Sequence, residues 1–135
     1  QIARAYSVIA NGGYLVTPYL SKIGKGNLDY KEPVKVDIDP KHLQVIRNGL
    51  SKVVQSGTGV SINYGSYTLP PVSGKTGTAE DALGGPDHAW FVCFAPSKDS
   101  ELLVVAFAEN TPGGGSVHAL PMARSILEEW YKNNK

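Results

Sequence analysis

The sequence predicts an α+β fold in which an antiparallel sheet packs against helices. Residues 89–95 and 102–108 are apolar throughout and do not alternate, so both are expected to be central strands covered on both faces. Residues 97–100 between them form a polar turn, and so short a connection allows only antiparallel pairing. Three other segments carry apolar residues at helical spacing and supply the helices.

The N-terminal part is predicted to hold one helix and short extended segments. One face of the helix carries Ile2, Ala5, Tyr6 and Ile9. Residues 11–13, Asn-Gly-Gly, are expected to end the helix, because glycine tolerates the left-handed geometry of a C-terminus. A short strand is predicted over 14–16 and a second extended piece over 19–23, followed by a loop or hairpin tip over 24–33.

A second helix is predicted over residues 40–55. Asp39 can cap it and Pro40 suits the first helical position. Its apolar positions are Leu43, Ile46, Leu50, Val53 and Val54. Residues 56–59 are expected to end this helix, and residues 63–71 form a loop rich in Gly, Ser, Tyr and Pro.

The C-terminal part is predicted to end in a helix over 118–132. Its apolar face consists of Leu120, Ala123, Ile126, Leu127 and Trp130. Residues 113–115, Gly-Gly-Gly, are predicted to be a flexible link before this helix, and residues 81–87 form a loop. Trp90 and Tyr131 are expected to be packing residues of the core.

Composition limits the classes of function. With 135 residues, 41% hydrophobic and 19% charged, the chain is globular and fits one domain or part of one. The net charge of +1 comes without a basic cluster, so we expect no nucleic-acid partner. No apolar run reaches the roughly 18 residues that a membrane span needs. The chain begins inside a helical pattern without Met, so we expect it to be part of a longer protein.

The single cysteine, Cys93, lies inside an apolar run and is expected to be an inert core thiol. The sequence has no cluster of His, Cys and carboxylate residues, so we predict neither a metal nor another cofactor.

The stretch Val72-Ser73-Gly74-Lys75-Thr76-Gly77-Thr78-Ala79-Glu80 carries the chemistry. As an edge strand it would place Lys75 and Gly77 on one side and Thr76 and Thr78 on the other. Glycine is costly inside a strand unless something approaches the backbone closely. Such a strand can hold an extended peptide, and a lysine beside hydroxyls favours an anion through hydrogen bonds of about 1.5–3 kcal/mol each.

Two other interpretations of this stretch compete. Gly74-Lys75-Thr76 matches the end of a phosphate-binding loop, but Leu69 stands where that pattern needs its first glycine, and Pro70 and Pro71 lack amide donors. A strand rather than a helix also follows. A purely structural edge strand with an exposed lysine stays open at this point.

Lys75-Thr76-Gly77 matches the K-T-G motif of penicillin-binding proteins and serine β-lactamases. With residues 87–92, Asp-His-Ala-Trp-Phe-Val, and 94–96, Phe-Ala-Pro, the stretch resembles the class B penicillin-binding transpeptidases of the PBP2 type. Residues 2–6 and 9–13 resemble the helix before that motif. The resemblance covers the whole chain and implies the C-terminal portion of the serine β-lactamase/transpeptidase-like fold.

The resemblance implies a serine enzyme that cross-links peptidoglycan stem peptides ending in D-Ala-D-Ala and that binds β-lactams. Lys75 and the Thr78 backbone N–H, half of an oxyanion hole, would be catalytic; such a donor is typically worth about 2.7–4 kcal/mol. Thr76, Gly77 and Thr78 would bind substrate. Asp87 and His88 would lie beside the site, unless His88 merely orders its turn by hydrogen bonding.

One part of the family's pattern is absent. No S-x-x-K precedes Lys75, and Ser61-Ile62-Asn63 spells S-x-N at a place where the family does not have it. We therefore expect residues 1–135 to be the C-terminal part of a transpeptidase domain, with the nucleophile upstream. Residues 102–108 would then have an unpaired edge that invites self-association.

Related functions remain open at the level of sequence. A D,D-carboxypeptidase or a penicillin-sensing domain has the same fold, whereas residues 87–92 disfavour a β-lactamase. A non-catalytic binding or scaffold module is the alternative of another class. For a transpeptidase, the resemblance implies partners in cell-wall synthesis and a location at the extracytoplasmic face of the membrane, with an anchor outside this chain.

Overall fold

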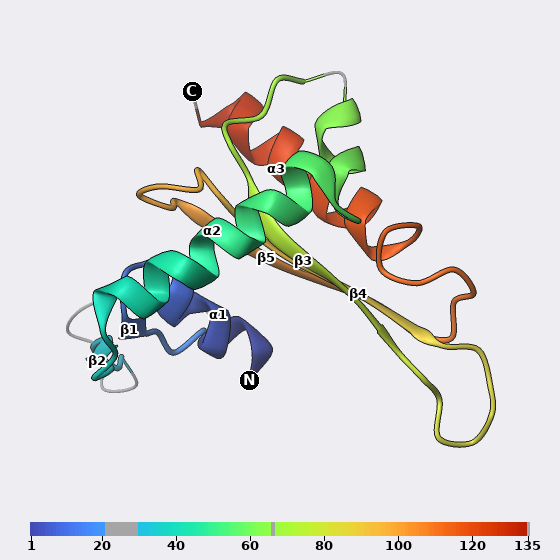
Figure 1. Cartoon of the computed structure of the whole chain (residues 1–135), viewed down its shortest axis with the longest axis horizontal. Coiled ribbons are helices and arrows are strands. Elements are labelled where there is room, and N and C mark those ends of the chain that lie inside the picture. The colour runs from blue at the N-terminus through green and yellow to red at the C-terminus, as the bar shows by residue number, and fades with distance from the viewer. Residues whose placement is uncertain (21–29, 66, 135) are drawn as a thin grey trace.

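The computed structural model describes residues 1–20, 30–65 and 67–134. Its main sheet has three antiparallel strands in the order β3-β4-β5, and a two-stranded sheet pairs β1 with β2 (Figure 1). The elements in chain order are α1 (Ile2–Ala10), β1 (Tyr14–Leu15), β2 (Val34–Lys35), α2 (Pro40–Ser56), the 3₁₀ helix η1 (Val60–Tyr64), β3 (Ser73–Ala79), β4 (His88–Ala95), β5 (Leu102–Ala108) and α3 (Ala119–Asn133). The predicted α+β class is confirmed.

The central strand of the main sheet is β4. Phe91, Cys93 and Phe94 have no exposed surface, as expected for a strand paired on both sides and covered on both faces. The same expectation for β5 is wrong. In the described part of the chain β5 pairs only with β4, and Phe107 is 40% exposed, because no described strand lies along its outer side.

Two apolar clusters hold the helices on the sheet. The larger joins α3 and η1 to one face; its largest members are Ile62, Phe91, Leu120, Leu127 and Tyr131. The smaller joins Ala10 of α1 and Leu50 of α2 to Phe94 on the other face. Because Val54 belongs to the larger cluster and Leu50 to the smaller, α2 runs beside β3 and contributes to both (Figure 1).

The second helix forms as predicted and ends one residue later than expected. The Asp39 carboxylate accepts a hydrogen bond from the Lys41 N–H at 2.8 Å, which confirms the cap. The predicted loop over 63–71 begins inside η1 instead. Ile62 is fully buried there, and the Asn63 side chain donates to the Val54 carbonyl at 3.1 Å, so core packing folds this turn.

β1 pairs with a strand that was not predicted from the sequence. Tyr14–Leu15 pairs with Val34–Lys35. Of the extended piece predicted over 19–23, residues 19 and 20 form no strand, and residues 21–23 lie outside the described part. Contacts from Lys35 support the pairing. Its ammonium donates to the Gly12 carbonyl at 2.9 Å and lies 4.5 Å from the Tyr14 ring centre.

The C-terminal helix buries only part of its predicted apolar face. Leu120, Ala123 and Leu127 are fully buried, whereas Ile126 is 49% and Trp130 40% exposed. Ile126 and Trp130 line an open hollow beside Leu102 of β5, which no described residue fills.

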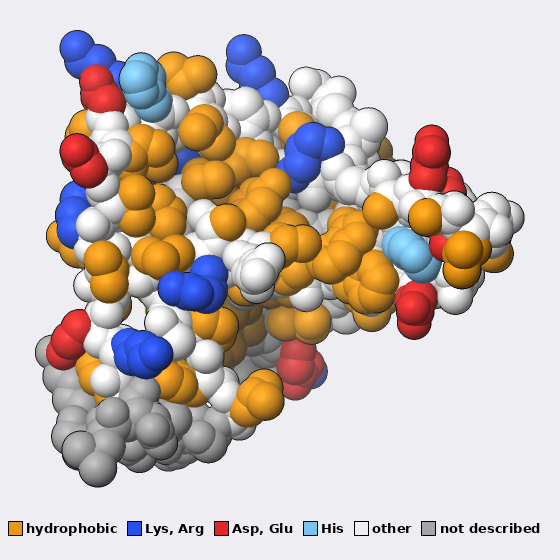
Figure 2. All heavy atoms as spheres, turned by 90° about the horizontal axis from the view of Figure 1, so that it is seen from below, with side chains coloured by type: hydrophobic (Ala, Val, Ile, Leu, Met, Phe, Trp, Pro, Cys, Tyr) orange, Lys and Arg blue, Asp and Glu red, His pale blue; other side chains and the backbone are white. Residues whose placement is uncertain are grey.

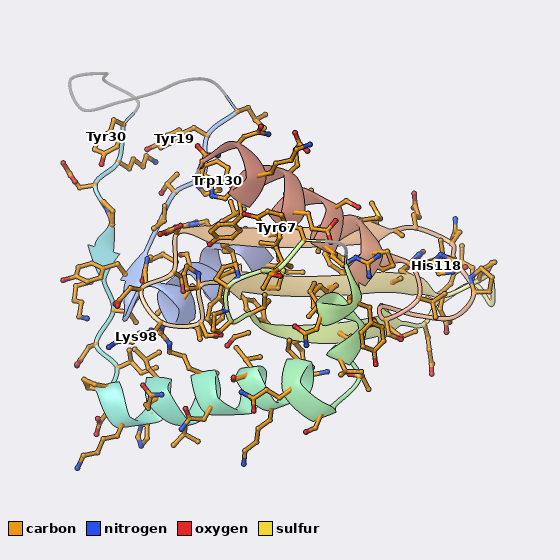
Figure 3. The ribbon with its side chains drawn as sticks, turned by 90° about the horizontal axis from the view of Figure 1, so that it is seen from above. Tyr19, Tyr30, Tyr67, Lys98, His118 and Trp130 are labelled. Carbon is orange, nitrogen blue, oxygen red and sulfur yellow. The ribbon has the colours of Figure 1, made fainter. Side chains whose placement is uncertain are left out.

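The predicted core role of Tyr131 is confirmed, since the residue is buried. Tyr67 lies beside this end of α3 and donates to the Tyr131 carbonyl at 3.1 Å (Figure 3). Trp90 is only half-buried and packs on Phe107, with ring centres 4.3 Å apart.

Candidate functional site

Strand β3 is buried where it starts and open where it ends. Ser73 and Gly74 are buried, and the Ser73 hydroxyl donates to the Ser97 hydroxyl at 2.8 Å. Lys75 and Thr78 are exposed. Because β3 pairs on one side only in the described sheet, the predicted edge strand is confirmed. A ligand can therefore reach the strand from Lys75 onward.

Lys75 lies at an open hollow of about 170 Å³ between β3, β4 and α1. The hollow is lined by Ile2, Tyr6, Lys75, Thr76, Gly77, Trp90 and Val92. The register sets Lys75 opposite Val92 and Gly77 opposite Trp90, so these four side-chain positions share a face, as alternation predicts. Figure 2 shows the molecule from below, the side on which α1 lies in Figure 1, and hydrophobic side chains gather across the middle of this face.

The Lys75 ammonium donates to the Thr76 carbonyl at 2.6 Å. A lysine ammonium has three donors, so two N–H groups remain for other partners. Tyr6 lines the same hollow, and burial raises the pKa of its phenol. Tyr6 thus stays a neutral group beside a positive charge.

Thr76 turns to the other side of the strand, opposite Phe91. Its hydroxyl oxygen lies 2.6 Å from the hydroxyl oxygen of Thr58, in the turn that follows α2. The two side chains are thus joined by a hydrogen bond between segments 18 residues apart in the sequence.

The segment over 113–115 packs tightly against β3, so the predicted flexible link is wrong. Gly114 and Gly115 are buried. A Cβ on Gly115 would lie 2.7 Å from the Gly77 carbonyl oxygen and 2.9 Å from its nitrogen, and a Cβ on Gly114 would collide with the Thr78 hydroxyl. The glycines allow the connection to lie directly on the strand. Hydrogen bonds to the Gly114 carbonyl from the Val117 and His118 N–H groups, both 3.3 Å, fix its course.

Asp87 and His88 lie at the far end of the β3–β4 pair. His88 is opposite Ala79, four pairs along from Lys75 and Val92. Its Nδ1 accepts a hydrogen bond from the Asn110 N–H at 3.1 Å, and the Asp87 carbonyl accepts one from the Thr111 N–H at 2.8 Å. These bonds tie the turn before β4 to the segment after β5, which is the structural role considered for His88.

Residues 1–128 match the family model of the penicillin binding protein transpeptidase domain. The chain belongs to this family. The peptidoglycan D,D-transpeptidase MrdA of Haemophilus influenzae is 30% identical over 100% of this chain and 24% of its own length. The stage V sporulation protein D of Bacillus subtilis is 33% identical over 96% of this chain and 22% of its own length.

Solved structures of penicillin-binding proteins share the fold. Pseudomonas aeruginosa PBP2, in complex with WCK 5153, is 27% identical with a TM-score of 0.78, over 98% of this chain and 30% of that one. A peptidoglycan synthase complex that coordinates polymerization and crosslinking contains a chain 33% identical, with a TM-score of 0.75, over 99% of this chain and 23% of that one. The predicted class B, PBP2-type resemblance and transpeptidase-like fold are confirmed. The chain spans about a quarter of the length of these curated relatives.

Three residues of this candidate site were not predicted from the sequence. Tyr6 was assigned only to a helix face, Thr58 only to a helix end, and Gly115 only to a linker. The Gly-Thr-Gly run over 57–59 was a usable signal for Thr58, because glycines on both sides of one polar residue suggest a tightly held turn. Within the described ranges no group of three His, Cys, Asp or Glu side chains could hold a metal ion, and no helix has the length and apolar character needed to cross a membrane.

Proposed function

We propose that residues 1–135 are the C-terminal part of a peptidoglycan D,D-transpeptidase domain and supply one wall of its active site. The observation that carries this proposal is the accessible end of β3. Lys75, Thr76, Gly77 and Thr78 stand there in succession on an edge strand, in a chain that the transpeptidase family model matches from residue 1 to 128.

The wall would hold the end of a stem peptide. The backbone of an edge strand can pair with an extended peptide, and Gly77 has no side chain to obstruct it. The hydroxyls of Thr76 and Thr78 would bind the terminal carboxylate of D-Ala-D-Ala. Lys75 would add positive charge, and the Thr78 N–H would donate to the oxyanion that forms during attack.

The attacking serine would come from a preceding segment of the same protein. Its oxygen bonds to the carbonyl carbon of the penultimate D-Ala, and the terminal D-Ala leaves as an amine after taking up a proton. An amine of a neighbouring stem then attacks the resulting ester, forms the cross-link and returns the proton to the serine. A β-lactam would follow the first step, and its opened ring would remain attached as a stable ester.

The protein's partners and cellular location follow from this reaction. The substrate lies outside the cytoplasmic membrane, so we propose that the protein works in the cell envelope, on the extracytoplasmic face, anchored by a segment outside this chain. Other cell-wall synthesis proteins would be its partners, which the likeness to a chain of the peptidoglycan synthase complex supports.

The test is labelling of the full-length protein with a fluorescent penicillin. Lys75→Ala is expected to lower the labelling rate about 10- to 150-fold, the equivalent of one lost hydrogen bond to a charged group. The matched control is Lys52→Ala, because Lys52 is an exposed lysine of α2. Undiminished labelling of the Lys75 variant would refute the role of Lys75.

Two further measurements separate the competing functions. The isolated chain should gain no mass from penicillin, and an adduct on any of its serines would place the nucleophile in this chain. In the full-length protein, product analysis with a donor stem and an amine acceptor should yield a cross-link. Release of D-Ala alone would indicate a carboxypeptidase, acylation without turnover a sensor, and no acylation at all a scaffold.

A further inference from the structure

The turn after α2 holds Thr58 in one position. The N–H groups of Gly57 and Gly59 both donate to the Val53 carbonyl, at 3.1 and 3.0 Å. A Cβ on Gly57 would lie 2.9 Å from Val53 Cα, and a Cβ on Gly59 would lie 3.2 Å from Val53 Cγ1. The backbone on both sides of Thr58 is therefore pressed against the end of α2.

This turn also packs on the ring that supports Thr76. A Cβ on Gly59 would lie 3.5 Å from Phe91 Cε2, and Phe91 is fully buried opposite Thr76 in the β3–β4 pair. The turn after α2 and strand β3 thus both contact the buried ring of Phe91. The 2.6 Å separation between the Thr58 and Thr76 hydroxyl oxygens follows from this common support.

The chemistry of two hydroxyls decides the direction of their hydrogen bond when an anion is bound. A threonine hydroxyl has one proton to donate and can accept from others, whereas an ionised carboxylate only accepts. If Thr76 donates its proton to a carboxylate, it has none left for Thr58. The bond between the threonines is then donated by Thr58.

We propose that Thr58 is a positioning residue that directs the Thr76 proton toward the ligand's carboxylate. Thr58 donates to the Thr76 oxygen, which holds the Thr76 side chain in one rotamer and leaves its proton for the ligand. Successive hydrogen bonds polarise one another, so the Thr76 donor is also strengthened. This proposal rests on the proposed role of Thr76 in binding the carboxylate.

The test compares two ligands on variants of the full-length protein. One ligand is a penicillin with its free carboxylate, and the other is the methyl ester of the same penicillin, which carries no anion at that position. Thr58→Val removes the hydroxyl and keeps the side-chain shape, and Thr58→Ser restores the hydroxyl. Thr68→Val, in the exposed loop before β3, is the matched control.

Thr58→Val is expected to lower the acylation rate by the free acid about three- to tenfold, as for one neutral hydrogen bond. The methyl ester should react with Thr58→Val and with the unchanged protein at the same rate. Thr58→Ser should recover the acid's rate to within about twofold, and Thr68→Val should change neither rate. In a Thr76→Val background, Thr58→Val should have no further effect.

Each result that differs from these expectations has a distinct meaning. An equal loss with acid and ester, a loss that adds to that of Thr76→Val, or no recovery with serine would overturn the positioning role. If Thr76→Val leaves the acid's rate unchanged, the proposed role of Thr76 fails first. Thermal unfolding of every variant identifies a loss that comes from misfolding, and the serine variant then provides the decisive comparison.

Discussion

Cys93 illustrates how a single side chain takes its chemistry from its surroundings. It lies on the central strand between Gly74 and Val104, with no exposed surface. Burial raises the pKa of its thiol to about 12. The thiol therefore stays protonated and unreactive in the folded domain, as its apolar neighbours in the sequence predict.

The raised pKa of Cys93 makes stability depend on pH in the alkaline range. In the unfolded chain the thiol loses its proton near its ordinary pKa, whereas in the folded chain it keeps the proton until about pH 12. The unfolded state then binds fewer protons, so the free energy of unfolding should fall as pH rises, by at most about 1.4 kcal/mol per pH unit.

Urea unfolding of the transpeptidase domain across that range measures this slope. Cys93→Ala is less stable at every pH because it leaves a cavity, but its slope should be flatter. Tyr131, whose pKa burial also raises to about 12, is present in both proteins and cancels in the comparison. Equal slopes would show that Cys93 titrates no differently in the folded and unfolded chains.

At the scale of elements, glycines set how closely segments approach β3. Gly74 has no room for a side chain, since a Cβ there would lie 2.8 Å from the Val92 carbonyl oxygen and 2.9 Å from Phe91 Cζ. Gly115 brings the β5–α3 connection against both strands of the β3–β4 pair, since a Cβ there would collide with the Trp90 carbonyl oxygen and lie 2.7 Å from that of Gly77. Close packing with β4 and with this connection thus holds β3 in place, which fixes the backbone that a ligand would meet.

Gly115→Ala is expected to destabilise the domain by roughly 1–3 kcal/mol, because the added methyl group would force β3 and the connection apart. Gly49→Ala is the control, since a Cβ on this exposed α2 residue has no neighbour within 4 Å. Alanine there should stabilise the helix by roughly 0.5–1 kcal/mol. Urea unfolding of both variants measures the difference; two stabilised variants would contradict the close packing at Gly115.

At the scale of the molecule, both outer strands of the main sheet have an unpaired edge among the described residues. α2 runs beside β3, whereas β5 pairs with β4 and has no described strand on its outer side. Apolar hollows lie on both sides of β5, one beside α1 and one beside α3, and Leu102 lines both. Such an edge offers unpaired backbone groups and apolar surface to another chain or to a preceding segment of the same protein.

The isolated chain is therefore expected to self-associate with rising concentration. Phe107→Lys should weaken this association, because a charge on an edge strand opposes pairing. Val45→Lys adds the same charge on the exposed side of α2, where Val45 is 69% exposed, and should have no effect. Sedimentation velocity measures the association; a monomer at all concentrations, or equal effects of both lysines, would refute association through β5.

Local pattern alone was enough to predict most elements of this protein. The apolar spacing of α1, α2 and α3, the Asp39-Pro40 start and the two apolar runs each reflect interactions within a few residues along the chain. The edge position of the strand that carries Lys75 could be predicted for the same reason. This strand contains glycines and polar residues, whereas the neighbouring central strand is apolar throughout. Side-chain alternation then assigned the faces of β3.

Contacts between distant segments could not be read from those patterns. The pairing of β1 with β2, the exposure of Ile126 and Trp130, and the burial of the 113–115 segment depend on which surfaces meet after folding. So does the hydrogen bond between Thr58 and Thr76, whose residues are 18 apart. Periodicity in the sequence shows only which face of a helix or strand is apolar. The path of the folded chain determines what covers that face and which side chains, such as the two threonine hydroxyls, come into contact.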